Sequence, residues 1–163
     1  MVVLLLSYGS KVDRTDNNEH TPLSTFLSKF TLGDRVETCQ LLLEHGANAL
    51  WTGPDGRNLA HLAACHHTME PGVLEALSNY GLDLSAKDKG GKSIVHHGAI
   101  SGSLSLEATT FLYERNILNL HDTDESGKSP LDYALQEANK ERSSFQFASS
   151  RWKRTLESLQ SFC

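Results

Sequence analysis

Gly56-Arg-Asn-Leu-Ala-His61 and Gly91-Lys-Ser-Ile-Val-His96 share one pattern: a glycine, a polar residue two positions later, and a histidine at the end. The pattern returns, with changes, as Glu19-His-Thr-Pro-Leu23 and Gly127-Lys-Ser-Pro-Leu-Asp132. The polar residues of the four stretches are 37, 35 and 36 residues apart (21 to 58, 58 to 93, 93 to 129). Four recurrences at a nearly constant spacing indicate a repeated structural unit.

The polar residue of each stretch predicts the start of a helix. Thr, Asn and Ser are preferred N-cap residues because their side-chain oxygen accepts a hydrogen bond from an unpaired amide of the first turn. Pro22 and Pro130 follow two of them, at the helical position where a missing N–H has no cost. The four predicted caps are Thr21, Asn58, Ser93 and Ser129.

The glycine two residues before three of these caps predicts a tight turn with positive φ. Gly56, Gly91 and Gly127 hold this position. The first stretch has Glu19 instead, which predicts a different turn there.

A second helix is predicted in each unit from apolar residues at helical spacing. The expected ranges are 36–45, 73–80 and 106–115, and Gly46, Gly81 and Asn116 follow them as left-handed C-terminal caps. The last helix is expected to begin at Ser143, with Gln146 in capping-box spacing. Its apolar stripe consists of Phe145, Ala148, Trp152, Leu156 and Leu159.

The succession of turn, short helix, loop, second helix and linker resembles the ankyrin repeat over essentially the whole chain. The family's T-P-L-H tetrapeptide stands as Thr21-Pro-Leu-Ser24, Asn58-Leu-Ala-His61, Ser93-Ile-Val-His96 and Ser129-Pro-Leu-Asp132. The units are a few residues longer than is usual in that family. The resemblance implies an all-α fold, a solenoid of stacked helix-turn-helix hairpins with β-turn tips.

The resemblance also divides the chain, which is expected to be one domain of residues 1–163. Residues 1–13 would be a partial N-terminal repeat, because residues 2–9 look like a second helix with its cap. Residues 14–52, 53–87 and 88–123 would be full repeats, and residues 124–163 a C-terminal capping repeat. The partial repeat leads us to expect that the natural protein extends further towards the N-terminus.

Composition narrows the classes of function. The chain has 163 residues, a net charge of −5 and 39% apolar residues, values typical of a soluble globular protein. Lys and Arg are spread thinly, which argues against nucleic-acid binding. The longest apolar run, residues 2–6, is far below the roughly 18 residues that span a bilayer. The cysteines Cys39, Cys65 and Cys163 are odd in number and scattered, so we expect a reducing, intracellular location, cytoplasmic or nuclear.

Histidines and cysteines are the candidates for chemistry. His61 and Cys65 have the i, i+4 spacing of one helical face, and His66 follows them. Adjacent residues on a helix point about 100° apart, so Cys65 and His66 cannot act on each other. The resemblance implies that His61 and His96 tie their own turn to the neighbouring one; a pH-sensitive role stays open because histidine titrates near neutrality. We expect no enzymatic activity, metal or cofactor.

Repeat arrays present extended concave surfaces, and the resemblance implies that turn tips and first helices bind another protein. Trp51 is a further candidate, either as an exposed anchor or as a ring packed under the adjacent turn. Arg57, Lys87, Lys89, Lys92 and Lys128 would form a positive strip for an acidic segment; the alternative is that they are merely solvated. The implied contact residues are Asn17, Asn18, His20, Ser28, Lys29, Asp55, Arg57, Cys65, His66, Lys87, Lys89, Lys92, Ile100, Ser101, Glu125, Lys128, Gln136 and Glu137.

The leading hypothesis for function is therefore a monomeric, non-catalytic protein–protein interaction module. The alternative is a regulatory or targeting segment of a larger multidomain enzyme or channel that makes mainly intramolecular contacts. Neither nucleic acid nor membrane is expected as a partner.

Overall fold

The computed structural model describes residues 11–29, 34–65, 68–143 and 150–161. No strand occurs among these residues, and a single isolated antiparallel bridge joins Thr52 and Asn58. The described part of the chain is therefore all-α, as predicted. Its helices are α2 (Pro22–Ser28), α3 (Arg35–Glu44), α4 (Leu59–Ala64), α5 (Pro71–Asn79), α6 (Ile94–Ser101), α7 (Leu106–Glu114), α8 (Pro130–Ser143) and α9 (Ser150–Gln160).

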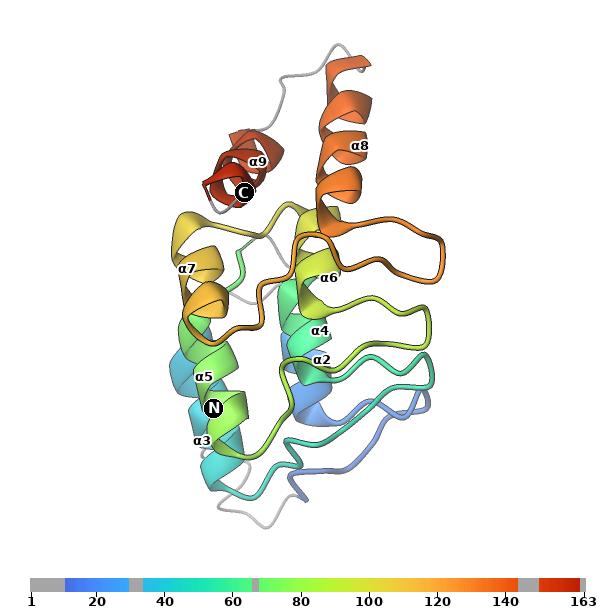
Figure 1. Cartoon of the computed structure of the whole chain (residues 1–163). Coiled ribbons are helices and arrows are strands. Elements are labelled where there is room, and N and C mark those ends of the chain that lie inside the picture. Colours follow the sequence, from blue (N-terminus) through green and yellow to red (C-terminus); the bar gives the residue numbers. More distant parts are fainter. Residues whose placement is uncertain (1–10, 30–33, 66–67, 144–149, 162–163) are drawn as a thin grey trace.

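The helices form two layers that are each stacked in chain order (Figure 1). In one layer α2 contacts α4, α4 contacts α6, and α6 contacts α8. In the other layer α3 contacts α5, α5 contacts α7, and α7 contacts α9. The loops that precede α4, α6 and α8 project to the same side (Figure 1). We call each loop tip with its two helices a unit, and units that follow one another in the chain lie side by side.

The four predicted N-caps are confirmed. Thr21 Oγ1 accepts from the amide of Ser24 at 3.2 Å, and Asn58 accepts from the amides of Ala60 and His61. Ser93 and Ser129 also stand directly before their helices. Thr21, Asn58 and Ser129 thereby satisfy backbone donors that the helix itself cannot pair.

All four turns have the same conformation, so the prediction of a different turn at Glu19 was wrong. Glu19 has φ +62°, in the left-handed region that Gly56, Gly91 and Gly127 occupy. Its N–H donates to Asp16 O at 3.1 Å, the bond that the three glycines also make within their turns. The Asp16 carboxylate accepts from the amides of Asn18 and His20, both at 2.9 Å. These bonds offset the steric cost of a side chain at positive φ.

The helix ends are partly as predicted. Gly46, Gly81 and Asn116 have positive φ, as expected for left-handed caps. The predicted start of the last helix was wrong, because Ser143 ends α8 and α9 begins at Ser150. Residues 131–143 contain neither Gly nor Pro and many good helix formers, so the helix that starts at Pro130 continues up to Ser143, where the last helix was predicted to begin.

Several predicted features lie outside the described residues. The partial repeat of residues 2–9 is one, and Phe145, Ala148 and the Trp152 side chain of the apolar stripe are others. The rest of that stripe is described: Leu159 is fully buried and Leu156 is half-buried.

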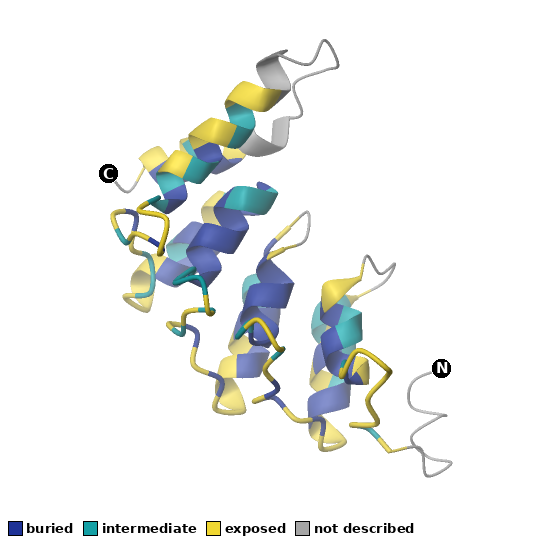
Figure 2. Cartoon of the chain, turned by 90° about the vertical axis from the view of Figure 1, so that its right-hand side faces the viewer, coloured by how far each residue is buried: buried dark blue, intermediate teal, exposed yellow. Residues whose placement is uncertain are grey.

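The core lies between the layers and between neighbouring units. Figure 2 shows buried residues along the helices and exposed residues along the loop tips. Leu23, Leu59 and Ile94, the first or second residue of α2, α4 and α6, are fully buried. None of the helices in the described ranges combines the length and apolar character that crossing a membrane requires.

Neighbouring turns are joined directly through their backbones. The Lys89 amide donates to Asp55 O, and the Glu125 amide donates to Gly90 O, both at 3.0 Å. Gly56 lies against the next turn so closely that a Cβ there would stand 2.8 Å from Lys89 N. The turns can approach in this way only where glycine leaves room.

The approach of the turns can be tested with Gly56→Ala. A side chain at positive φ costs about 1–2 kcal/mol, and the clash with the Lys89 backbone should add roughly 1–3 kcal/mol of overpacking. Gly81→Ala is the matched control, because Gly81 has φ +87° but no atom within 4 Å of its added Cβ. Urea unfolding should show the larger loss for Gly56→Ala; equal losses would contradict the close contact of the turns.

The docking of α9 can be tested with Leu159→Ala. Leu159 is fully buried, and Thr155 Oγ1 on the same helix donates to Leu104 O at 3.1 Å. Truncating a buried leucine should cost about 2–5 kcal/mol of unfolding free energy. Leu135→Ala on α8, where the side chain is 43% exposed, should cost well below about 1 kcal/mol. Similar losses in chemical denaturation would mean that α9 does not close the stack.

Candidate functional site

The candidate surface consists of the four turns and the ends of the helices that follow them. The turns span residues 16–20, 53–57, 88–92 and 124–128, and each closes with a backbone bond from its first N–H to its last carbonyl, for example Asp88 N to Lys92 O at 2.9 Å. The last residue of each turn is basic or histidine: His20, Arg57, Lys92 and Lys128. The shared geometry sets these side chains in a row along the stack.

His61 and His96 hold the turns together, as the resemblance implied. His61 Nδ1 accepts from the Asn58 amide at 3.2 Å, so its proton is on Nε2, which donates to Lys92 O at 3.1 Å in the next turn. His96 repeats this arrangement between Ser93 N and Lys128 O, at 3.2 Å each. Both rings are fully buried, and each connects one helix start to the turn of the following unit.

Burial keeps these histidines neutral. It lowers the pKa of His61 to about 4, and the nearby His97 acts in the same direction. Burial also lowers the pKa of His96. Because both ring nitrogens of each residue are used in structural bonds, neither histidine offers a lone pair for a ligand. No group of three or more metal-binding side chains was found within the described ranges.

The expected positive strip is largely neutralised, which corrects the sequence-based expectation. Arg57 pairs with Asp55, and Lys87 Nζ lies 2.7 Å from Asp122 Oδ1. Lys92 Nζ lies 2.9 Å from Asp124 Oδ2, whose side chain is fully buried. Three of the five cations thus have a carboxylate partner within the chain.

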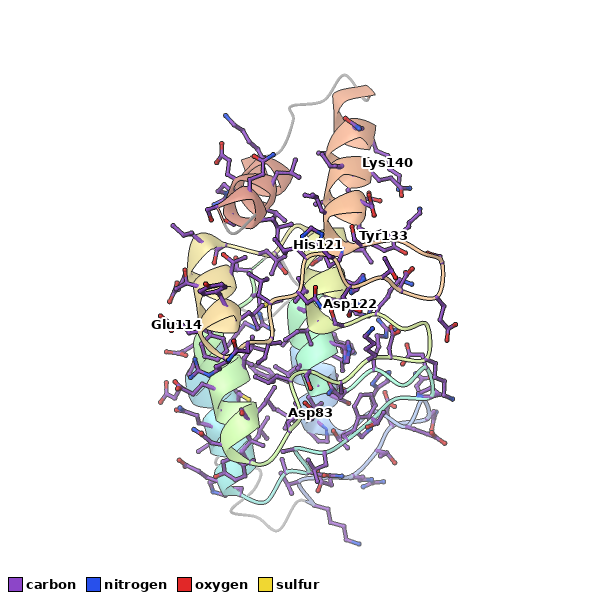
Figure 3. The ribbon with its side chains drawn as sticks, viewed as in Figure 1. Asp83, Glu114, His121, Asp122, Tyr133 and Lys140 are labelled. Atoms are coloured by element: carbon purple, nitrogen blue, oxygen red, sulfur yellow. The ribbon has the colours of Figure 1, made fainter. Side chains whose placement is uncertain are left out.

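Asp55 and Asp124 belong to the turns themselves, and Asp122 lies two residues before the last turn. Figure 3 shows Asp122 in the loop that leads to α8 and Tyr133 on the first turns of that helix. Asp124 accepts from the Tyr133 hydroxyl at 2.6 Å, as well as from Ser126 and the Lys128 amide. These hydrogen bonds and Lys92 hold the pKa of the Asp124 carboxyl well below its usual range, against the opposing effect of burial. The aspartate at this position is required by the turn and neutralises the lysine as a consequence.

Lys89 and Lys128 remain as cations without an ion-pair partner among the described residues. Lys89 Nζ donates to Pro54 O at 2.7 Å in the preceding turn, and the residue is exposed. Lys128 Nζ donates to Gln136 Oε1 at 2.8 Å and lies over the Tyr133 ring. Among the five cations of the predicted strip, these two are the positions where an outside carboxylate would add an ion pair to those within the described residues.

Two predicted contact residues point into the protein. Trp51 is 8% exposed, stacks near the His20 ring and donates from Nε1 to Glu19 O at 3.0 Å, so it packs under the adjacent turn. Ser101 Oγ donates to Ala64 O at 2.7 Å and so links α6 to α4. Both side chains are used in the stack and are removed from the candidate surface.

The other candidates occupy the expected surface to different degrees. His66 lies outside the described residues, and Glu137 is half-buried and paired with Lys140. His20 and Ile100 are half-buried. Asn17, Asn18, Ser28, Lys29, Asp55, Glu125 and Gln136 are exposed.

The structure brings together one group that the sequence analysis missed. Cys65, which follows α4, has its Sγ 3.5 Å from His97 Nδ1 on α6, and His97 Nε2 lies 2.8 Å from Asp88 Oδ2. The sequence analysis tested Cys65 only against its neighbour His66. The signal for the pair of Cys65 and His97 was the stacking of adjacent units. This stacking places the C-terminal end of α4 against the middle of α6.

Comparison with known proteins gave no relative: no protein-family model and no curated protein matches the chain.

The neutral state of His61 predicts acid sensitivity. The folded pKa of about 4 lies below the ordinary 6.5, so the unfolded state binds more protons between these values and stability falls as the pH falls. From pH 7 to pH 5, His61 alone should contribute a loss of roughly 2 kcal/mol. Urea unfolding at both pH values measures this loss. His61→Gln should reduce the difference, whereas the same change at exposed His121 should not; an unchanged pH dependence in His61→Gln would exclude His61 as its source.

Proposed function

We propose that this chain is a non-catalytic protein-binding module of the ankyrin-repeat type, which binds its partner on the turn tips and the adjacent face of the first helices. The observation that supports the proposal most is the pair of buried histidines, each of which joins its N-cap to the next turn. This bond gives the tips a fixed spacing without using their outward side chains. A rigid row of exposed polar tips suits the binding of an extended surface on another protein.

The chemistry of the tips supports binding rather than turnover. Three buried titratable groups, His61, His96 and Asp124, are occupied in hydrogen bonds that hold the turns. The exposed tip residues are polar and differ from turn to turn: Asn17 and Asn18, then Asp55, then Lys89, then Glu125. Such a mixed row favours recognition through complementary polar contacts.

The partner is proposed to carry an acidic segment that reaches Lys89 and Lys128. Because neither lysine forms an ion pair with a carboxylate in the described part of the chain, a partner carboxylate gains an ion pair without breaking one of those. Pairs of this kind are partly exposed, so binding should weaken as salt rises. Free Cys39 and Cys65 suit a reducing, intracellular setting, which we include in the proposal.

The second candidate is a regulatory or targeting segment of a larger protein, with mainly intramolecular contacts. Leu106 and Tyr113 on α7 favour it, because they are 60% and 59% exposed on the layer that lies away from the tips. Exposed apolar side chains on one helix are suited to contact with another part of a longer chain.

Charge reversal at the tips tests the leading proposal. The chain would be used to capture partners from a cell extract, and each captured protein would then be titrated against Lys89→Glu, Lys128→Glu and the control Lys153→Glu on α9, where the side chain is 80% exposed. The tip variants should each weaken binding several-fold, by about 1 kcal/mol or more, and most strongly at low salt.

The control should bind as the unchanged chain does. Equal affinities of all three variants would refute the tip surface. Loss of binding only after Leu106→Ser and Tyr113→Ser would support the second candidate instead.

A further inference from the structure

The Cys65–His97–Asp88 group has the order of a nucleophile, a base and a residue that orients the base. Cys65 caps the end of α4 and is exposed, whereas His97 and Asp88 are mostly buried with side chains 11% and 10% exposed. The Sγ to Nδ1 distance is 3.5 Å and the Nε2 to Oδ2 distance is 2.8 Å. Unlike His61 and His96, His97 makes none of the described bonds to a carbonyl of the next turn; its two ring nitrogens face Cys65 and Asp88 instead.

Asp88 fixes the tautomer of His97. Its Oδ1 accepts from the amides of Gly90 and Lys92, both at 2.9 Å, which anchors the carboxylate in the turn. These bonds and His97 hold the pKa of Asp88 below its usual range, against the opposing effect of burial. The ionised Oδ2 can only accept, so His97 Nε2 carries the proton and donates. The lone pair of Nδ1 therefore faces the Cys65 thiol.

The charges around His97 keep it in the neutral, proton-accepting form. Burial lowers its pKa, Asp88 opposes this effect, and Arg57 and Lys92 reinforce it. The His61 ring meets it edge-on, with ring centroids 5.2 Å apart, and stays uncharged near neutral pH. A neutral imidazole beside a thiol is the starting state for general-base catalysis.

We propose that Cys65 is a site of oxidation by hydrogen peroxide, in which His97 accepts the thiol proton and Asp88 positions His97. Sγ attacks one peroxide oxygen, so an S–O bond forms and the O–O bond breaks. The sulfur is oxidised by two electrons to a sulfenic acid. The thiol proton passes through His97 Nδ1 to the leaving hydroxide, which departs as water. This site is independent of the proposed partner-binding function.

The surroundings of the thiol make the base necessary. Partial burial raises the pKa of Cys65, and the Arg57 guanidinium opposes this rise. Cys65 also lies at the C-terminal end of α4, where the helix dipole disfavours a negative charge. A thiol that does not ionise readily by itself depends on a neighbouring base during attack.

Cys39 provides an internal contrast in the same protein. It is fully buried in α3, and burial raises its pKa to about 11. Cys39 should stay reduced as long as the chain is folded. Its oxidation therefore reports unfolding in every sample.

The experiment measures the rate at which hydrogen peroxide oxidises each cysteine between pH 5 and pH 8. The sulfenic acid is trapped with dimedone, and peptide mass spectrometry separates Cys39, Cys65 and Cys163. In the unchanged chain, the Cys65 rate should stay nearly constant from pH 8 down to the His97 pKa, below the ordinary 6.5. Without a base, the rate should fall about tenfold per pH unit, as for an isolated thiol below its pKa.

Two variants separate the base from the fold. Asp88→Asn can keep the acceptor for Gly90 and Lys92 but presents an NH₂ to Nε2, which moves the His97 proton to Nδ1 and removes the base. His97→Gln keeps a donor to Asp88 and has no base. At pH 6, hydrogen peroxide should oxidise Cys65 in both variants at least about tenfold more slowly than in the unchanged chain. Cys39 should stay reduced in both.

The proposal is overturned if both variants retain the pH profile and rate of the unchanged chain within about twofold. It is also overturned if the oxidation rate of Cys65 in the unchanged chain falls about tenfold for each unit by which the pH is lowered, or if Cys65 is oxidised no faster than Cys39. This second criterion needs no variant, so the test stands even if Asp88→Asn and His97→Gln do not fold.

Discussion

The hydrogen bond from a buried, neutral histidine to the carbonyl of the next turn is the contact on which the stack depends. His61 and His96 each use one ring nitrogen for the start of their own helix and the other for the following turn. A charged imidazole could not do this, because both nitrogens would be donors. The bond to the helix start and the bond to the next turn therefore both require that the ring stays uncharged. Local structure and stacking form together.

The surface charge follows from the same geometry. A turn that closes in the left-handed conformation leaves amides that need an acceptor, and an aspartate at its first position supplies one in three of the four turns. In the last of these turns the aspartate, Asp124, also pairs with Lys92 of the preceding turn. Arg57 and Lys92 of the row of basic residues are thus paired with carboxylates that lie in the turns. Basic residues that lie in a row therefore do not by themselves make a basic face, because neighbouring carboxylates can neutralise them.

The sequence predicted what depends on neighbours in the chain. Caps such as Thr21 and Asn116 act within one turn of helix, so residue type and spacing were sufficient. The errors concern contacts between units or competition between local signals. Glu19 adopts a glycine-like conformation because surrounding bonds offset its cost. Trp51 is buried by the preceding turn, and Cys65 meets a histidine 32 residues away. These contacts depend on how far one unit is shifted along the next, which the spacing of the repeats does not specify.

The junction between the first and second units shows that different residues can meet the same structural need. Ser24 stands where His61 and His96 stand in the later units, and a serine hydroxyl is too short to reach the next turn. The indole N–H of Trp51 instead connects the linker before the second turn to Glu19 O in the first turn. This junction thus also has a ring N–H that donates to a turn carbonyl. Here the ring belongs to the later unit and the carbonyl to the earlier one, the reverse of the arrangement at His61 and His96. The requirement on the sequence is thus a ring N–H that reaches a turn carbonyl at each junction, and a search by residue letters does not detect that requirement.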